Sequence, residues 1–189
     1  MKLDKIAVAS GNKGKIKEIK QIFTGAETVS MSELGFDGDI PETGTTFKEN
    51  ALIKAKFIAE KFNLPALADD SGLCVDALGG APGIYSARYS GGDDADNRRF
   101  LLEKLGGCAD RRARFESAVC LYFPDGKYFF GEGATYGSIL FEDTGGNGFG
   151  YDCLFYSDDL KKSFGIASAE EKNAVSHRYR ALCDLRSKL

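Results

Sequence analysis

The chain has 189 residues, of which 43% are hydrophobic and 28% charged, and its formal net charge at pH 7 is -3. These proportions suit one domain, or two lobes sharing a core, and they exclude a disordered chain and disfavour a dedicated nucleic-acid-binding protein. The sequence shows no long apolar run and no signal-like leader, so we expect a cytoplasmic protein without a membrane span. Its five cysteines never form a C-x-x-C pair, which predicts reduced core thiols.

The first predicted element is a strand over residues 5–10, which meets a glycine and an asparagine before isoleucines begin to recur at helical spacing. A strand-to-helix junction offers free backbone N–H groups and the positive end of a helix to an anion. Lys13 and Lys15 add positive charge there, although S-G-N-K-G-K is not the Walker pattern. Two interpretations stay open, namely a phosphate site or a helix cap followed by two surface lysines.

A second strand is predicted over residues 28–31, followed by a polar loop. Thr46 and Glu49 then have the spacing of a capping box and predict a helix that runs to about Phe62. Lys54 falls close to the apolar stripe of this helix. Its ammonium group either snorkels to solvent or faces a carboxylate or a phosphate.

Two adjacent acidic residues, Asp69 and Asp70, follow a short buried strand over residues 66–68 and precede Ser71 and Gly72. Like charges side by side repel and cost desolvation, so such a pair usually persists beside a cation. Carboxylates are also preferred ligands of Mg²⁺. The segment is therefore either a metal or catalytic site, or a solvated Asp-Asp-Ser-Gly turn.

The second half of the chain predicts a helix over residues 93–105 and a long hairpin. Apolar and polar residues alternate over 112–123, Pro124 begins a turn, and residues 128–140 form the returning strand. Three glycines in that strand imply bends or bulges. Strand character resumes at Leu154.

Between the hairpin and that last strand, a glycine-rich run leads to Phe149. A phenylalanine between two glycines can present its ring to a planar base, although a strand entered through a turn explains the same residues.

The tail predicts a helix capped by Ser168. On one continuous helix Lys172 and His177 would point about 140° apart, at about 100° per residue. Ser176 is a good N-cap, so we predict a break there that brings His177 and Arg178 round to the side of Lys172. The alternative is a lone histidine beside an arginine on a surface helix.

Taken together, six segments resemble the inosine triphosphate pyrophosphatase family, whose members hydrolyse deaminated purine nucleoside triphosphates (XTP, ITP and dITP) to the monophosphate and pyrophosphate. The segments are S-G-N-K-G-K (10–15), E-T-G-T-T-F-K-E-N-A (42–51), L-A-D-D-S-G-L (67–73), G-G-A-P-G-I-Y-S-A-R-Y-S-G (79–91), G-F-G-Y-D (148–152) and S-H-R (176–178). The resemblance spans nearly the whole chain and favours the site interpretation in each case above. The resemblance implies an α/β fold with a long, twisted mixed sheet and flanking helices. These elements would form a single domain, 1–189, whose two lobes surround a deep cleft. The family is typically homodimeric.

The resemblance also implies roles for individual residues. The substrate's triphosphate would lie in the first loop, which contains Ser10, Gly11, Asn12, Lys13, Gly14 and Lys15, and would also meet Lys54 and Ser71. Asp70 would be the base that activates the attacking water, and Mg²⁺ would be served by Glu42, Asp70 and Asp69. The base and sugar would contact Phe149, Gly150, Tyr151 and Asp152, and the purine would be read by Lys172, His177 and Arg178. One departure from the family is Cys153, which stands where proline is usual.

Two other classes remain as alternatives. A nucleotide-binding regulator without catalysis would need the phosphate loop but not the pair of Glu42 and Asp70. A septum-formation-type pyrophosphatase, acting on pyrimidine or modified nucleotides, would share the general fold but lack the terminal S-H-R.

Overall fold

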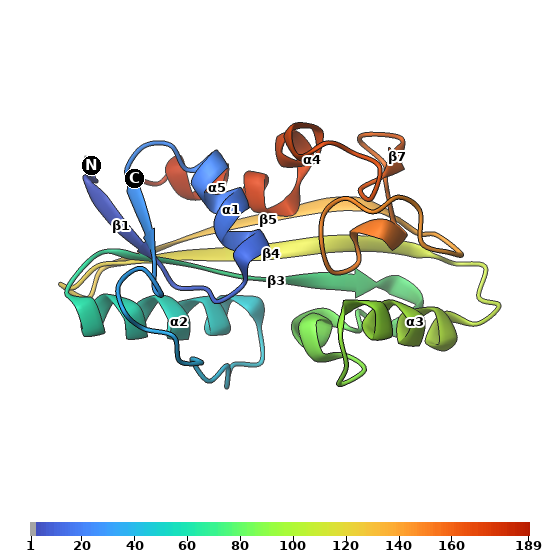
Figure 1. The fold of residues 1–189 in the computed structure, drawn as a ribbon, viewed down its shortest axis with the longest axis horizontal. Coiled ribbons are helices and arrows are strands. Elements are labelled where there is room, and N and C mark those ends of the chain that lie inside the picture. The colour runs from blue at the N-terminus through green and yellow to red at the C-terminus, as the bar shows by residue number, and fades with distance from the viewer. Residues whose placement is uncertain (1–2) are drawn as a thin grey trace. The chain divides into compact units, whose positions relative to one another are not determined.

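The computed structural model describes residues 3–189 (Figure 1). Its strands are β1 (Lys5–Val8), β2 (Glu27–Ser30), β3 (Ala66–Val75), β4 (Arg112–Tyr122), β5 (Tyr128–Ile139), β6 (Phe155–Ser157) and β7 (Lys162–Ser163). Its α-helices are α1 (Lys13–Ile22), α2 (Phe47–Phe62), α3 (Asp94–Leu105), α4 (Ala169–Val175) and α5 (His177–Arg186). Short 3₁₀ helices are η1 (Asp76–Leu78), η2 (Gly83–Arg88) and η3 (Asp152–Leu154). Within residues 3–189, no helix is both long enough and apolar enough to cross a membrane.

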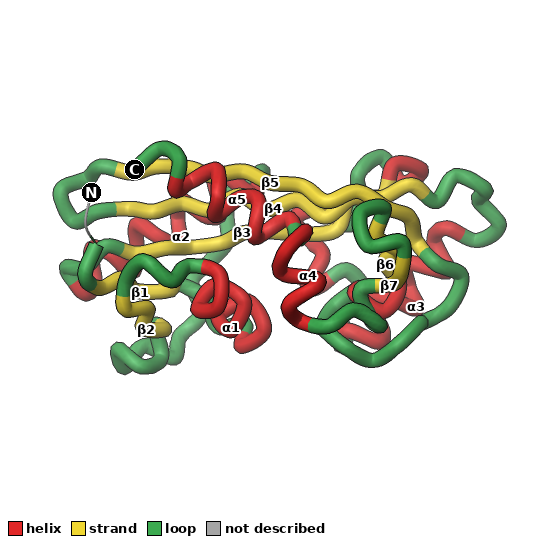
Figure 2. Tube along the Cα trace, turned by 90° about the horizontal axis from the view of Figure 1, so that it is seen from above, coloured by secondary structure: helices red, strands yellow, loops and turns green. Residues whose placement is uncertain are grey.

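The strands form one mixed sheet in the order β2-β1-β3-β4-β5-β6-β7. β1 pairs in parallel with β2 and with β3, and Ala7 of β1 lies opposite Ala66 of β3. β6 is antiparallel to both β5 and β7, and Figure 2 shows the two short strands β6 and β7 side by side. Parallel pairs need long crossovers, which α1 and α2 supply, whereas the antiparallel hairpin of β4 and β5 needs only a short turn.

The chain folds into two compact units. Unit 1 consists of Met1–Asp70, Ser117–Gly133 and Arg178–Leu189, and unit 2 of Ser71–Glu116 and Ala134–His177. Three strands, β3, β4 and β5, contribute residues to both units.

In unit 1, α2 covers one face of the sheet, and α1 and α5 cover the other (Figure 1). Consecutive residues of a strand point to opposite faces, which divides the core in two. In β3, Ala66 and Ala68 pack on the α2 side, whereas Leu67 packs with Ile19 of α1 and Leu182 of α5. The core of unit 2 contains an aromatic cluster, in which Phe155 packs against Phe115 and Phe164 with ring centroids 4.8 and 5.1 Å apart.

Several predicted helix boundaries are confirmed. Thr46 caps α2 by accepting a hydrogen bond from the Glu49 N–H (3.2 Å), although the Glu49 carboxylate turns back to the N–H of Thr45 (2.6 Å) instead of completing a box with Thr46. Ser168 and Glu171 form a complete capping box at α4. The chain breaks as predicted at Ser176, whose backbone is extended between α4 and α5.

The expectation of five core thiols is right only in part. All five cysteines are free, but Cys183 on α5 is exposed and only Cys74 and Cys120 are buried. Burial raises the pKa of Cys74 to about 11 and that of Cys120 to about 12, so these two thiols are unreactive.

The glycines of β5 do not interrupt the strand. A Cβ atom on Gly131 would lie 2.1 Å from the Ala181 carbonyl oxygen and 2.5 Å from the Leu185 nitrogen, so this glycine lets α5 pack directly on the strand. Gly131→Ala should lower the free energy of unfolding by about 1 to 3 kcal/mol, because backbone atoms must move. Gly146→Ala, where no atom lies within 4 Å, is the matched control. Denaturant unfolding measures both, and equal stability of the two variants would contradict the packing argument.

Candidate active site

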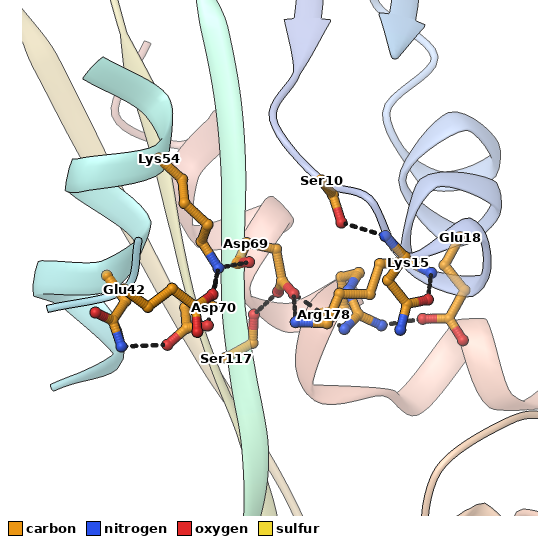
Figure 3. Close-up of polar contacts among 11 residues, drawn as sticks. Ser10, Lys15, Glu18, Glu42, Lys54, Asp69, Asp70, Ser117 and Arg178 are labelled. Carbon is orange, nitrogen blue, oxygen red and sulfur yellow. Dashed lines mark hydrogen bonds and ion pairs between the residues drawn. The ribbon is translucent and has the colours of Figure 1, made fainter. Parts of the chain in front are cut away.

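The two adjacent carboxylates lie inside a strand. β3 does not end at residue 68 but continues through Asp69 and Asp70 to Val75. The solvated turn considered from the sequence is therefore wrong, since Asp69 is 1% exposed and Asp70 6%. Neighbouring side chains of a strand point to opposite faces, so the two carboxylates are directed apart and each has its own cation (Figure 3). Ser71, the next residue of β3, is half-buried and belongs to unit 2.

Asp70 faces α2. The Lys54 Nζ donates to Asp70 Oδ1 (2.9 Å) and to Glu42 Oε1 (2.7 Å), and Asn50 Nδ2 donates to Asp70 Oδ2 (3.2 Å). Asn50 and Lys54 are four residues apart and share one face of α2. The lysine side chain is only 10% exposed, so it does not snorkel to solvent, and of the alternatives considered the carboxylate partner is correct.

The electrostatics of this face suit a base. Burial raises the pKa of Asp70 above its ordinary value, against the opposing pull of Lys54 and Lys15. Burial by itself would lower the pKa of Lys54, but Asp70 and Glu42 outweigh it and hold that pKa above its ordinary value, so the ammonium group stays charged. A carboxylate whose pKa is raised accepts a proton more readily than an ordinary one.

The same face fits a divalent cation. Glu42 and Asp70 both contact a single positively charged atom, Lys54 Nζ, so their oxygens are close enough to share a cation. Among residues 3–189, no three histidine, cysteine or acidic side chains gather into a metal-binding cluster. Two carboxylates completed by water and phosphate oxygens are typical of Mg²⁺ bound with a nucleotide, and this donor set matches that pattern.

Asp69 faces the opposite side of β3, toward α1 and α5. Its Oδ1 accepts from Ser117 Oγ (2.5 Å), and its Oδ2 pairs with Lys15 Nζ (2.9 Å) and Arg178 Nη2 (3.1 Å). Arg178 Nη1 also pairs with the carboxylate of Glu18 on α1. Burial alone would raise the pKa of Asp69, but Arg178 and Lys15 hold it well below its ordinary value. The buried carboxylate is thus an anchor for two cations. Because it faces away from Asp70, the structure does not bring it together with Glu42 and Asp70 as the third predicted Mg²⁺ ligand.

The loop between β1 and α1 is a helix cap. Asn12 accepts a hydrogen bond from the Lys15 N–H (3.0 Å), and Ser10 Oγ accepts one from the Asn12 N–H (3.2 Å). The predicted helix cap is therefore present, but the expectation of two surface lysines is wrong, because Lys13 is exposed whereas Lys15 forms an ion pair with Asp69. A phosphate role for this loop stays a prediction. Gly11 is exposed and Gly14 is half-buried in the first turn of α1.

A second polar group lies in unit 2. Asp152 Oδ2 accepts from Lys172 Nζ (2.7 Å) and from the Phe149 N–H (2.8 Å). The same Lys172 Nζ lies 4.5 Å from the centroid of the Phe149 ring, close enough for a cation–π contact. The Tyr151 hydroxyl donates to the Ser86 carbonyl (2.9 Å). Lysine, carboxylate and aromatic ring thus form one connected set beside Gly150.

His177 and Arg178, at the start of α5, are both buried, so the alternative of a surface pair is wrong. The His177 ring stacks on Phe115, with centroids 4.9 Å apart and planes 16° apart. His177 belongs to unit 2 with Lys172, whereas Arg178 belongs to unit 1 with Asp69. The joint reading of a purine by these residues stays a prediction.

Comparison with known proteins shows the family of the chain. The profile of the Ham1 family matches residues 6–188. The chain belongs to the Ham1 family. A Haemophilus influenzae relative named dITP/XTP pyrophosphatase is 46% identical to this chain over 193 residues, and the match covers 98% of each chain. A Staphylococcus aureus relative of the same name is 43% identical over 182 residues, and the match covers 95% of this chain and 93% of the relative.

Solved Ham1 proteins have the same fold. A Staphylococcus aureus Ham1 protein matches with a TM-score of 0.87 at 43% identity, covering 98% of this chain and 97% of its own. A Coxiella burnetii Ham1 protein matches with a TM-score of 0.88 at 37% identity, covering 98% of both chains. The resemblance and the mixed α/β sheet predicted from the sequence are confirmed.

Three polar residues of this candidate site were not identified from the sequence: Glu18, Asn50 and Ser117. Each carries a weak signal. Glu18 follows Lys15 by one helical turn, Asn50 adjoins the buried Ala51, and Ser117 interrupts the apolar face of β4. A polar residue on an otherwise buried face is the pattern that could have found them.

Proposed function

We propose that this Ham1 protein hydrolyses deaminated purine nucleoside triphosphates (XTP, ITP and dITP) to the monophosphate and pyrophosphate, and so removes them from the nucleotide pool. The observation that carries the proposal is a buried carboxylate of raised pKa, Asp70, which shares one ammonium group with Glu42. The names of the Haemophilus influenzae and Staphylococcus aureus relatives support the substrate class. Pyrophosphate release from ITP and ATP tests it.

Asp70, Lys54 and Lys15 can supply what hydrolysis of a triphosphate needs. Attack on a phosphoanhydride requires neutralisation of phosphate charge and a base for the attacking water. Asp70 orients the water and accepts its proton, while the water oxygen bonds to phosphorus and the bond to the pyrophosphate leaving group breaks. Lys54 and Lys15 neutralise phosphate oxygens. A Mg²⁺ ion held by Glu42 and Asp70 would supply further positive charge to the triphosphate.

Selectivity rests on position 6 of the purine. Hypoxanthine and xanthine carry a carbonyl acceptor there, whereas adenine carries an amino donor. Lys172 can only donate, and its Nζ lies 4.5 Å from the Phe149 ring that would stack on the base. A donor left facing the adenine amino group is unpaired, which disfavours the wrong substrate by on the order of 10⁴-fold in sites of this type. Guanine shares the 6-carbonyl, so its exclusion must come from position 2.

The alternatives are less well supported. A regulator without catalysis has no use for the buried pair of Glu42 and Asp70. A septum-formation-type pyrophosphatase would lack the S-H-R segment at 176–178, and the relatives named above are dITP/XTP pyrophosphatases.

The proposal also includes Mg²⁺, a homodimer and a cytoplasmic location. The two carboxylates around Lys54 Nζ support the metal, and the family resemblance supports the dimer. The five free thiols and the nucleotide substrates support the cytoplasm. Chelation of divalent cations should abolish turnover, and light scattering should give the mass of two chains.

A phosphate role for Lys15 predicts a selective loss of affinity. Lys15→Ala should weaken binding of ITP by about 10-fold or more while changing affinity for IMP little, because the lost charge-assisted bonds go to the terminal phosphates. Lys17→Ala, which removes an exposed lysine from the same helix, is the control. Titration calorimetry with both nucleotides measures the difference, with divalent cations chelated so that ITP is not hydrolysed during the titration. Equal weakening of ITP and IMP by Lys15→Ala would show that Lys15 does not bind the terminal phosphates.

A further inference from the structure

The loop that contains Phe149 is hydrogen-bonded to α3 through one residue, Gly150. Asp94 Oδ2 accepts a hydrogen bond from the Gly150 N–H (2.8 Å), and Arg98 Nη1 donates one to the Gly150 carbonyl oxygen (2.8 Å). Asp94 and Arg98 are four residues apart on α3 and therefore share a face of the helix. Both backbone polar groups of Gly150, whose φ is +60°, are thus held by a single helix.

The Arg98 guanidinium is itself fixed. Its Nε contacts both carboxylate oxygens of Asp143, at 2.9 and 3.0 Å, while Nη1 remains on Gly150. The next residue toward the helix N-terminus, Asn97, is buried and accepts from the N–H and Oγ of Ser90, both at 2.8 Å. The first turns of α3 therefore anchor two loops of unit 2, and Arg98 has little freedom to release Gly150.

A fixed Gly150 restricts its neighbours. The Phe149 N–H donates a hydrogen bond to Asp152 Oδ2, which also accepts one from Lys172 Nζ. The Tyr151 hydroxyl donates a hydrogen bond to the Ser86 carbonyl oxygen. With the peptide on the other side of Phe149 held by α3, the Phe149 backbone is hydrogen-bonded on both sides, which limits the positions that its ring can take beside the lysine.

We propose that Asp94 and Arg98 are positioning residues, which hold Gly150 so that the Phe149 ring is ready to receive the purine base. The proposal rests on the function proposed above, in which that ring contacts the base. The two hydrogen bonds between α3 and Gly150 affect the binding of the base and not the chemistry at Asp70. Loss of these bonds should therefore raise KM and leave kcat nearly unchanged, because the binding energy that is lost is shared by the substrate and its transition state.

Arg98→Ala tests this, with Arg99→Ala as the matched control. Arg99 lies on the same helix, pairs with Asp96, and has a side chain that is 67% exposed, compared with 16% for Arg98. Arg98→Ala should raise KM for ITP by about 10-fold, the size expected when a charge-assisted bond is lost. It should also speed amide exchange over residues 146–152, while Arg99→Ala should change neither quantity. Hydrogen-exchange mass spectrometry gives a readout that does not depend on activity.

A conservative variant, Arg98→Lys, keeps the positioning role testable if Arg98→Ala does not fold. Arg98→Lys keeps one donor for the Gly150 carbonyl but cannot also bridge to Asp143, so its KM should fall between those of the wild type and Arg98→Ala. If Arg98→Ala matches Arg99→Ala in KM, or if exchange rises while KM stays constant, the positioning role is overturned although ITP hydrolysis stands. A wild-type protein that does not hydrolyse ITP would overturn the proposed function and, with it, the role in base binding.

Discussion

Asp70→Asn should leave the protein folded and lower the rate of ITP hydrolysis by about 100-fold or more. The amide keeps the shape of the side chain but removes the base and one negative charge that Mg²⁺ would use. Stability should change little, since burial already disfavours the charged form of Asp70, and the Lys54 ammonium keeps its partner Glu42. Circular dichroism, denaturant unfolding and turnover should be measured on the same preparation.

The control for this variant is Asp158→Asn, which changes an exposed aspartate in the same chemical way. It should hydrolyse ITP at the wild-type rate. If Asp70→Asn retains more than about a tenth of that rate, Asp70 is not the base.

Arg178→Ala should lower the free energy of unfolding by about 3 to 5 kcal/mol, the cost of breaking a buried ion pair by removing one partner. Arg178 is 1% exposed, and its loss removes a buried cation from the carboxylates of Glu18 and Asp69, of which Asp69 keeps Lys15. Arg186→Ala, at the exposed end of the same helix, should cost less than about 1 kcal/mol. Denaturant unfolding of both variants measures the difference, and equal losses would show that the buried network contributes little.

The Arg178 guanidinium could either read the purine or only anchor Asp69 and Glu18. Kinetic measurements on Arg178→Ala below its unfolding temperature separate these two roles. If Arg178 reads the purine, the ratio of kcat/KM for ITP to that for ATP should collapse by about 10- to 100-fold. An equal fall for both nucleotides would restrict Arg178 to anchoring Asp69 and Glu18.

Local patterns predicted most of the elements in this chain. The caps at Thr46 and Ser168, the break at Ser176 and the hairpin of β4 and β5 all depend on residues close together in sequence, and each is present. The end of β3 was misplaced, because two aspartates in a buried strand are unfavourable unless partners arrive from elsewhere. Those partners come from α1, α2 and α5, which no local pattern reveals.

The sequence predicts a set of candidate residues, but not the division of these residues between the two faces of the sheet. Once β3 is known to continue through Asp69 and Asp70, the alternation of a strand separates them. Asp70 then belongs with Lys54 and Asp69 with Lys15. Long-range pairs of this kind, such as Arg178 with Glu18, have no signature in a single sequence.

The most direct test of the proposed function is product analysis by ³¹P NMR. The wild-type protein should be given ITP, XTP, ATP and GTP in turn, with Mg²⁺ and then with a chelator. ITP and XTP should yield the nucleoside monophosphate and pyrophosphate in equal amounts, ATP should react on the order of 10⁴-fold more slowly, and chelation should stop the reaction. Release of orthophosphate with formation of a nucleoside diphosphate, or equal rates for ITP and ATP, would show that the proposed function is wrong.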